Sequence, residues 1–405
     1  MTTTINNEHK KLNVPNLRFP EFEGEWEKCK LGDICAFLSG GTPKIDIKEY
    51  WDGTIPFVSA ISMHNTYISD SNLHISEKGL KNGSKLLKKN NLLLLVRGSM
   101  LWKSIPVCLI ESDVAFNQDV KGIIPNDTTN NKFLLYWLKA KEQRLKYMVT
   151  GTGLGAGKLD TNDLLSMSVY APSMNEQDKI AKLLSLLDER IATQNKIIED
   201  LKKLKSAIID YAINSLDSGF VKFGSLYEMA GEGGTPTTSN ASFYDNGKIP
   251  FIKIDDLKKK YLTENKDFIT ELGLQKSSAW LVPSRSILFS NGATIGGITI
   301  TTYPVCTKQG ILGIVPKQNI DVEFLYYFMS SSFFKKAVSR IVTEGTMKTA
   351  YLKDINNILC PIPTKEKQQE IAKIPSALNS KIDFEQSILK LFCSQKQYLL
   401  RQMFI

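Results

Sequence analysis

Residues 176–214 carry the longest uninterrupted helical pattern in the chain, with no Gly or Pro inside it. Apolar residues recur there at intervals of three and four, which is the spacing of a helix that pairs with another helix. Counted in sevens from Ile180, eight of ten seam positions are apolar. The predicted seam is Ile180, Leu183, Leu187, Arg190, Gln194, Ile197, Leu201, Leu204, Ile208 and Tyr211. At about 1.5 Å per residue this helix is expected to be roughly 58 Å long.

The pattern returns 191 residues later, at 367–405. The residues that repeat at this offset are Gln368, Ile371, Ala372, Lys373, Ser376, Leu378, Ile382, Ile388 and Lys396. We expect the helix-pair and partner interface of this second copy to contain Ile371, Leu378, Lys381, Glu385, Ile388 and Phe392. Arg190 and Gln194 correspond to Lys381 and Glu385, so an Arg opposite a Glu could fix the register of the pair.

The second copy departs from the first at Pro375, which stands where the first copy has Leu184. Proline removes a helical hydrogen bond, so the second helix is expected either to kink there or to begin there. Its seam is also poorer, with six apolar positions of ten. We therefore expect its C-terminal third to need a partner.

Chain direction predicts how the two helices pair. Residues 215 to about 363 leave the C-terminal end of the first helix and enter the N-terminal end of the second. A compact domain bridges those ends only when they are neighbours, so the pairing should be antiparallel. The first domain is then expected near the C-terminus of the chain, giving a pseudo-twofold dumbbell. The alternative is two unrelated amphipathic helices, each covering its own domain.

The segments outside the helices are duplicated as well. GGTP at 40–43 recurs at 233–236, and IPF at 55–57 recurs at 249–251. Three longer segments match: LLLLVRGSM (92–100) with SILFSNGAT (286–294), AFNQDVKGIIP (115–125) with CTKQGILGIVP (306–316), and KFLLYWL (132–138) with EFLYYFM (323–329). Each copy has short strand patterns with Gly, Asn and Pro turns, then one helix, then a polar loop.

We therefore predict an α/β (α+β) fold with two similar domains of mixed strands and helices, separated by a long antiparallel two-helix coiled coil. The expected bounds are an N-terminal arm and first domain at 1–172, a helix at 173–214, a second domain at 215–363 and a helix at 364–405. Residues 1–12 are expected to be disordered. Between the matching segments the two copies diverge, so their loops are expected to recognise two different ligands.

Composition narrows the class of protein. The net charge is +9, from 51 Lys and Arg against 42 Asp and Glu, which suits a polyanionic partner but does not by itself establish one. The longest apolar run, at 92–96, is too short to cross a bilayer, and the polar N-terminus has no signal-peptide pattern. We expect a soluble, cytoplasmic protein. The six cysteines show no CxxC pair and are expected to be reduced.

Two glycine-containing motifs could lie near phosphates. TGTGLGAGK at 150–158 resembles a phosphate loop, but Thr152 stands where a Walker A motif needs Gly, and Leu159 follows Lys158. It is either a flexible basic loop near DNA or a plain linker, and its counterpart VTEGTMKTAYL has lost most of the glycines. GGTP could present backbone N–H groups to a phosphate or could be only a tight turn.

Catalytic and metal-binding patterns are weak. The only histidines are His9, His64 and His74, all in the first half, without a zinc-binding or triad spacing. Asp255 followed by Glu264 and Lys266 weakly suggests a nuclease cluster, but the first half has no equivalent. There is no NPPY-like tetrapeptide of an amino-methyltransferase. We expect no catalytic residues and no metal site in this chain.

The remaining candidates are hydrogen-bonding and basic residues in the loops. As a set on two matched scaffolds, they fit phosphate contacts with some base readout. The DNA-binding candidates are Thr42, Lys44, Lys81, Lys85, Arg97, Lys103, Asn117 and Lys158 in the first half, and Thr235, Lys253, Lys258, Lys259, Lys260, Arg285, Asn291, Lys308 and Lys348 in the second.

Over essentially its whole length the chain resembles the specificity subunits of Type I restriction-modification systems. The resemblance rests on the duplicated GGTP to IPF segments, the GT-containing loop before each long helix, and the dipeptides Ala171-Pro172 and Ile362-Pro363. It also rests on the helix starts EQDKIAKLL and KQQEIAKIP and on the LRFPEFEGEWE lead-in.

The resemblance implies a non-catalytic subunit of a methyltransferase and endonuclease complex, with two target-recognition domains that each read half of a split, asymmetric DNA sequence. It implies helices that set the distance between the half-sites and dock methyltransferase subunits, two being expected. S-adenosylmethionine and ATP are then expected on the methyltransferase and the motor-nuclease partners, with no cofactor in this chain. The alternatives are a self-contained restriction or modification enzyme and a coiled-coil protein adaptor without DNA specificity.

Overall fold

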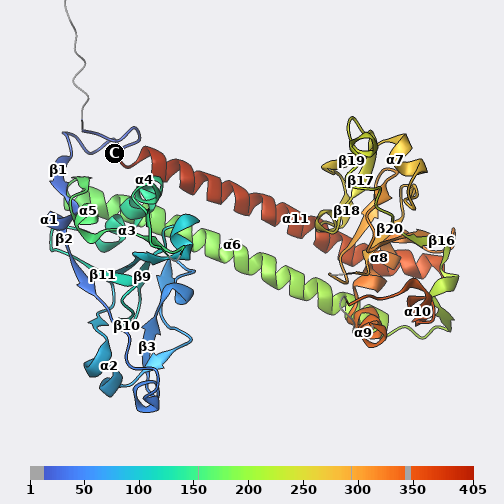
Figure 1. The fold of residues 1–405 in the computed structure, drawn as a ribbon, viewed down its shortest axis with the longest axis horizontal. Coiled ribbons are helices and arrows are strands. Elements are labelled where there is room, and N and C mark those ends of the chain that lie inside the picture. The colour runs from blue at the N-terminus through green and yellow to red at the C-terminus, as the bar shows by residue number, and fades with distance from the viewer. Residues whose placement is uncertain (1–12, 154, 293, 343–347) are drawn as a thin grey trace, which may run out of the picture. The chain divides into compact units, whose positions relative to one another are not determined.

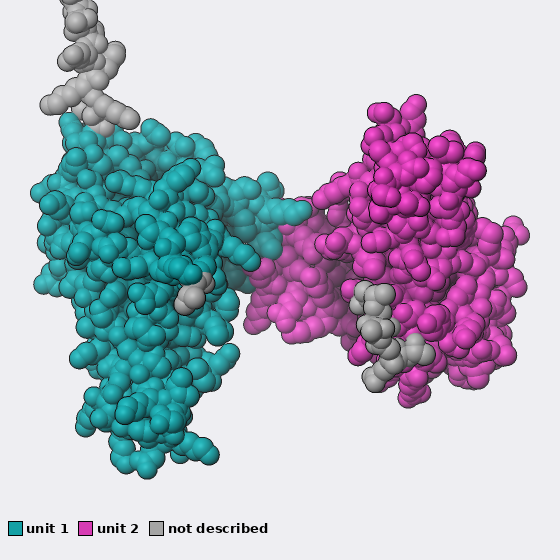
Figure 2. Space-filling model, in the orientation of Figure 1, with its two compact units in different colours: residues 1–193, 389–405 teal, residues 194–388 magenta. Residues whose placement is uncertain are grey.

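The structure is a computed structural model that describes residues 13–153, 155–292, 294–342 and 348–405. It divides into two compact units, one formed by 1–193 with 389–405 and the other by 194–388 (Figure 2). Both units mix strands with helices, as predicted. None of the helices described is both long and apolar enough to cross a membrane.

The first unit is built on a five-stranded sheet in the order β2-β11-β7-β9-β4. All neighbours are antiparallel except β4 and β9. The four leucines of β7 are all buried, because the sheet is covered on both faces. The strands are β2 (Cys35–Ser39), β11 (Val120–Pro125), β7 (Leu92–Leu95), β9 (Val107–Ile110) and β4 (Tyr67–Ile68), and α3 (Asn131–Ala140) packs against β9 (Figure 1).

Smaller sheets complete this unit. A four-stranded sheet has the order β5-β3-β10-β6, with β10 and β3 parallel, and two further sheets have the orders β12-β13-β8 and β1-β14. The strands are β1 (Glu27–Lys30), β3 (Ile55–Val58), β5 (His74–Ile75), β6 (Leu86–Leu87), β8 (Arg97–Gly98), β10 (Val114–Phe116), β12 (Thr150–Gly151), β13 (Gly157–Lys158) and β14 (Ser168–Ala171). The shorter helices are α1 (Leu31–Ile34), α2 (Glu77–Gly83), α4 (Glu142–Tyr147) and α5 (Thr161–Leu165).

The second unit repeats this plan. Its main sheet has the order β16-β23-β20-β21-β18, again with only the last pair parallel, and its smaller sheets are β19-β17-β22 and β15-β24. The strands are β15 (Phe220–Lys222), β16 (Tyr227–Glu232), β17 (Ile249–Ile252), β18 (Tyr261–Leu262), β19 (Asp267–Ile269), β20 (Ile287–Ser290), β21 (Ile298–Thr301), β22 (Cys306–Thr307), β23 (Ile311–Pro316) and β24 (Leu359–Pro361). The helices are α7 (Glu271–Gln275), α8 (Val322–Ser330), α9 (Ser332–Ile341) and α10 (Leu352–Ile355). The predicted duplication is therefore confirmed for the main sheets and for the sheets around β3 and β17, whereas β6 and the β12-β13-β8 sheet have no counterpart among the described strands of the second unit.

The two long helices are α6 (Met174–Asn214) and α11 (Lys365–Gln402). In the first unit Asp188 of α6 pairs with Lys396 of α11, and the Arg190 guanidinium lies 5.2 Å from the centre of the Phe392 ring. In the second unit Gln194 donates to the Glu385 carbonyl over 3.1 Å, and Lys205 donates to Asn379 over 3.0 Å. Residue numbers rise on one helix as they fall on the other, so the predicted antiparallel pairing is confirmed within each unit.

The predicted seam is only half correct. The buried positions of α6 follow from Ile180 in steps of four and then three, through Leu184, Leu187, Gln194 and Ile198. The sequence prediction took three before four, which gave Arg190, Ile197, Leu204 and Tyr211 in place of their inward neighbours. On α11 the same error placed exposed Lys381 in the seam instead of buried Ile382. The error arises because apolar residues stand at both spacings, as in Leu183-Leu184 and Ile197-Ile198.

The predicted contact between Arg190 and Glu385 is wrong, because it was based on the same incorrect seam. Arg190 is exposed and covers a ring, whereas buried Gln194 donates to both the carbonyl and the carboxylate of Glu385. Lys381 is the cation on this carboxylate, one helical turn away at 2.5 Å. Both contacts lower the pKa of Glu385.

Pro375 lies inside α11, ten residues after the helix begins at Lys365, so the helix does not start there. The C-terminal third is also better packed than its sequence suggested. Leu400, Met403 and Phe404 are buried in the core of the first unit, where the Phe404 ring lies 5.4 Å from that of Phe133. This end of α11 therefore has an apolar partner in its own chain.

Candidate nucleic-acid interface

One edge of the main sheet in the first unit gathers the ends of four strands. Ser39 at the end of β2 faces Lys121, Leu95 at the end of β7 faces Val120, and Leu94 faces Val107 at the start of β9. The loops that leave these strands therefore meet at this edge. They contain Thr42, Asn117, Arg97 and Lys103, so the topology brings together residues from three separate stretches of sequence.

The GGTP loop is held at this edge by close backbone packing. A Cβ on Gly40 would lie 2.3 Å from the Phe116 carbonyl oxygen, and a Cβ on Gly41 would lie 2.4 Å from the Gly83 carbonyl oxygen. In the second unit a Cβ on Gly233 would lie 2.2 Å from the Thr307 carbonyl oxygen. No side chain fits in these gaps, which favours the tight-turn interpretation of GGTP over a phosphate cradle.

The threonine of each GGTP loop contacts a glutamine at the same repeat position. Thr42 donates to the Gln118 side-chain oxygen over 2.7 Å, and the Thr235 hydroxyl accepts from the Gln309 backbone N–H over 3.3 Å. Both glutamines are exposed. Neither glutamine was among the residues predicted from the sequence, although both stand 191 residues apart in the matched segments.

The TGTGLGAGK segment forms a hairpin beside the same edge. Its strands β12 and β13 pair with each other, β13 also pairs with β8, and Lys158 lies directly opposite Arg97. Opposed residues in a sheet present their side chains on one face, so two cations lie side by side. Trp102, half exposed, donates its indole N–H to the Gly155 carbonyl over 3.0 Å and links the hairpin to the 3-10 helix Ser99–Trp102. Residue 154 of this loop lies outside the described part.

The other candidates of the first unit lie around the GGTP loop. A Cβ on Gly83, at the end of α2, would lie 2.4 Å from Pro43 Cα, so Lys81 and Lys85 flank the loop. Lys44 is exposed, and its carbonyl accepts from the Trp51 indole. Asn117 is half-buried and exchanges hydrogen bonds with Asp119, which makes it a brace of the turn.

The matching edge of the second unit carries fewer exposed candidates. Thr235 and Lys308 lie at it, and the Lys308 N–H donates to the Ile252 carbonyl, which brings Lys253 close. Lys348 is exposed two residues before Ala350, whose N–H donates to the Asn291 carbonyl. The polar loop predicted here falls largely on residues 343–347, outside the described residues.

A pocket of about 460 Å³ in the second unit is lined by four lysines, three of them DNA-binding candidates, and by four carboxylates. Lys253 pairs with Asp267 at 2.7 Å, Lys258 with Asp255 at 3.2 Å, and Lys259 with Glu264 at 3.0 Å. The pocket is thus nearly neutral, and these lysines must exchange partners before they bind a phosphate. Among the described residues no group of three or more His, Cys, Asp or Glu side chains could hold a metal ion.

Two second-unit candidates are buried, and a third lies at the other end of the main sheet. Lys260 is only 5% exposed and pairs with Glu323. Asn291 is 1% exposed, and its amide donates to the Ala350 carbonyl over 3.2 Å. Arg285 is exposed but lies at the opposite end of β20, where its N–H donates to the Thr301 carbonyl. Sequence position alone could not separate Lys260 and Asn291 from surface residues, because their burial depends on tertiary packing.

The Type I restriction modification DNA specificity domain matches this chain twice, at residues 23–203 and 216–391. The chain belongs to that family, as its sequence suggested. It is 26% identical over 385 residues to the Type I restriction enzyme MjaIX specificity subunit of Methanocaldococcus jannaschii, covering 88% of each chain. It is 30% identical over 208 residues to the EcoR124I/EcoR124II specificity subunit of Escherichia coli, covering 50% of each. The fold is that of the Type I S subunit from M. genitalium, with a TM-score of 0.59, 19% identity, and coverage of 97% of this chain and 99% of that one.

Proposed function

We propose that this chain is the DNA-recognition subunit of a Type I restriction-modification complex, without catalytic activity of its own, and that it reads a bipartite, asymmetric target with one domain for each half-site. The observation that carries this proposal is that the main sheets of the two units repeat one strand order but present different side chains at the matching edge. The first unit presents exposed Arg97 opposite Lys158 of the β12-β13 hairpin, where Lys158 pairs with Asp160 at 3.6 Å. The second unit presents a pocket lined by lysines and carboxylates in equal number. Two scaffolds alike in their backbone and unlike in their loops suit the readout of two different sequences.

Exchange of residues 215–363 for the corresponding domain of a related subunit tests this proposal. The complex is expressed in a host without its own system, and methylated positions are mapped across the genome. One half-site should change while the other stays as in wild type. A change in both halves, or a single undivided target in the wild type, would contradict the proposal.

We further propose that methyltransferase subunits dock on one side of the helix pair. In the second unit Ile197, Leu204 and Tyr211 recur every seven residues and are exposed, so they form one apolar stripe beside the seam. On α11 the exposed Ile374 matches Leu183, which lies two heptads before Ile197, and Phe384 is exposed ten residues further along α11. A twofold axis that exchanges two antiparallel helices places the equivalent residues of both helices on the same side of the pair. Monomers rarely leave such a face uncovered.

The substitution Leu204→Glu tests the docking side, because a charge at the centre of an apolar interface is costly to desolvate. Ser206→Glu adds the same charge at an exposed position on the other side of α6 and serves as control. The first variant should lose co-elution with the methyltransferase on size exclusion, and the second should keep it. Equal binding by both variants would rule out this side.

A further inference from the structure

Lys260 is a buried cation at the point where the second domain meets α11. Its backbone is fixed in the main sheet, because its carbonyl accepts from the Ile300 N–H over 2.7 Å and from the Thr299 hydroxyl over 3.2 Å. Its side chain is 2% exposed. The chain therefore places an ammonium group inside the second unit, directly before β18 (Tyr261–Leu262).

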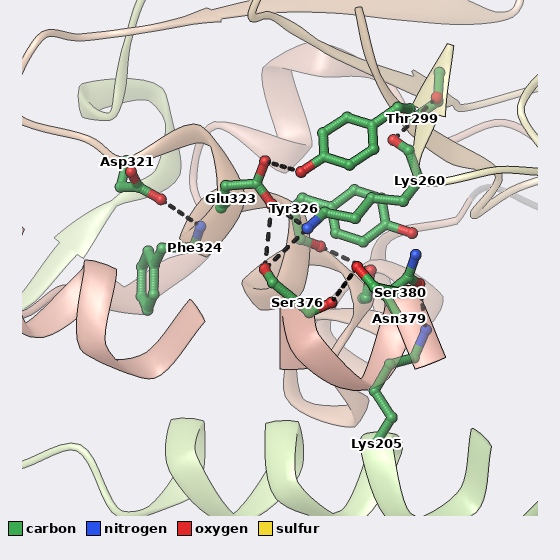
Figure 3. Close-up of polar contacts among 12 residues, drawn as sticks. Lys205, Lys260, Thr299, Asp321, Glu323, Phe324, Tyr326, Ser376, Asn379 and Ser380 are labelled. Carbon is green, nitrogen blue, oxygen red and sulfur yellow. Dashed lines mark hydrogen bonds and ion pairs between the residues drawn. The ribbon is translucent and has the colours of Figure 1, made fainter. Parts of the chain in front are cut away.

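The surroundings of this ammonium group satisfy its charge (Figure 3). It pairs with the Glu323 carboxylate of α8 and donates to the Ser376 hydroxyl of α11 over 3.0 Å. Glu323 also accepts from the Tyr261 hydroxyl over 2.5 Å and from Ser376 over 3.4 Å. Three aromatic rings complete the site, with centres 4.7 to 5.9 Å from Nζ, namely those of Tyr261, Tyr326 and Tyr327.

These contacts join three elements by directional bonds. Lys260 belongs to the sheet edge, Glu323 to α8, and Ser376 to the turn of α11 that follows Pro375. One turn further along α11, Asn379 accepts from Lys205 of α6, so the same stretch is also tied to the other long helix. Rotation of the domain about the helix pair would separate the ammonium group from Ser376 and leave charge buried without its full set of partners.

A polar junction occupies the equivalent place in the first unit. At the 191-residue offset Ser185 matches Ser376, Tyr136 matches Tyr327, and Asp188 matches Asn379. The Tyr136 hydroxyl donates to Asp188 over 2.9 Å and to Ser185 over 3.4 Å, and Asp188 pairs with Lys396, which matches Lys205. The two units thus anchor the domain to the helices at the same residues but with different charges.

We propose that the Lys260–Glu323–Ser376 junction is a positioning device that fixes the orientation of the second domain on the helix pair, and so restricts the number of unread base pairs between the half-sites. This inference rests on the bipartite reading proposed above. A buried ion pair adds little net stability compared with apolar residues of similar size, but it restricts geometry because its hydrogen bonds are directional. Removal of the whole pair should therefore relax spacing more than it weakens folding.

The test uses the double variant Lys260→Met with Glu323→Leu in the full chain, assembled with its methyltransferase. Met and Leu keep much of the volume and leave no unpaired charge, so the domain should fold even if Lys260→Met alone does not. The control is Lys367→Met, at an exposed lysine of α11 that pairs with Glu370 at 2.9 Å. Methylated sites are mapped across a genome, and both half-site sequences and the gap between them are read.

We expect the double variant to keep both half-site sequences and to methylate sites with one base pair more or fewer between them at least tenfold above wild type. Lys367→Met should keep the wild-type gap. Strict wild-type spacing in an active double variant would overturn the inference, as would an equal loss of methylation at every spacing in a folded complex. An undivided target in the wild type and the control would instead contradict the proposed function itself.

Discussion

Lys139 of α3 is a residue whose burial should be measurable in the stability of the first unit. Its ammonium group donates to Thr66 over 2.7 Å. Burial, with the nearby charge of Lys396, lowers its pKa to about 8 from the ordinary value of 10.5. The folded chain therefore binds fewer protons than the unfolded chain between these pH values, so stability should rise with pH through that window.

Substitution Lys139→Met should remove this dependence. Below about pH 8 the cost of burying the charge is fully present, so the variant should be more stable at pH 7 by on the order of 1–3 kcal/mol. Between pH 8 and 10 its advantage should shrink. Urea unfolding followed by tryptophan fluorescence at several pH values provides the measurement. Lys88→Met, at a largely exposed side chain, should shift stability by less than about 0.5 kcal/mol at every pH.

Arg97 and Arg285 offer a matched comparison at the two ends of the main sheets. Arg97→Ala and Lys158→Ala should each weaken binding of the assembled complex to its target, because they remove cations from the edge where the loops gather. Each loss should reduce the slope of log affinity against log salt by about 1 if the contact is to a phosphate. Arg285→Ala should change neither quantity. Anisotropy titrations at several salt concentrations distinguish these outcomes, and an equal effect of Arg285→Ala would refute the assignment of the edge.

Individual loop residues are where the sequence was least informative. Lys253, Lys258, Lys259 and Lys260 look alike as a basic run, but three are surface lysines paired with carboxylates and the fourth is buried. Asn291 likewise resembles a reader of bases and instead braces a turn. A side chain's environment is set by segments distant in sequence, here α8 and α11 for Lys260, and no local pattern records them.

At the scale of elements, substitutions at two neighbouring residues can test which face of α6 is buried against α11. Ile198 is 6% exposed and Ile197 is 40% exposed. Ile198→Ala should cost about 2–4 kcal/mol in free energy of unfolding, since it opens a cavity between the helices. Ile197→Ala should cost less than about 1 kcal/mol, since its side chain is already partly in water.

Urea unfolding of the isolated chain measures both values, and reversal of their order would restore the seam predicted from the sequence. Ile197→Ala has a further use, because this residue lies on the proposed docking side. It should weaken co-elution with the methyltransferase more than Ile198→Ala does in a folded chain.

Elements were predictable where the pattern was long or repeated. The two helices follow from heptads without breakers, and the strand order of the second unit follows the first because GGTP, IPF and the other matched segments occupy the same places in both sheets. The phase of the seam was not predictable, because pairs such as Leu183-Leu184 place apolar residues on both possible seams. Which one is buried depends on where the domains pack: Ser185 and Asp188 contact Tyr136 of the first domain and thereby orient α6.

At the scale of the whole molecule, the expectation that the helices measure the gap between half-sites can be tested by lengthening them. Four residues inserted after Gln194 and four after Phe384 lie opposite each other in an antiparallel pair and leave the Gln194–Glu385 contact in place. Each helix then grows by roughly 6 Å, close to the rise of two base pairs at about 3.4 Å each. The following segment also rotates by about 40° beyond a full turn, in the same right-handed sense as the added base pairs. We expect unchanged half-sites with one or two more base pairs between them, as measured by methylation mapping.

The control is an insertion of four residues after Gly219, in the turn between α6 and β15. It lengthens the chain without lengthening a helix and should keep the wild-type gap. An active complex with lengthened helices and an unchanged gap would show that the distance is set elsewhere.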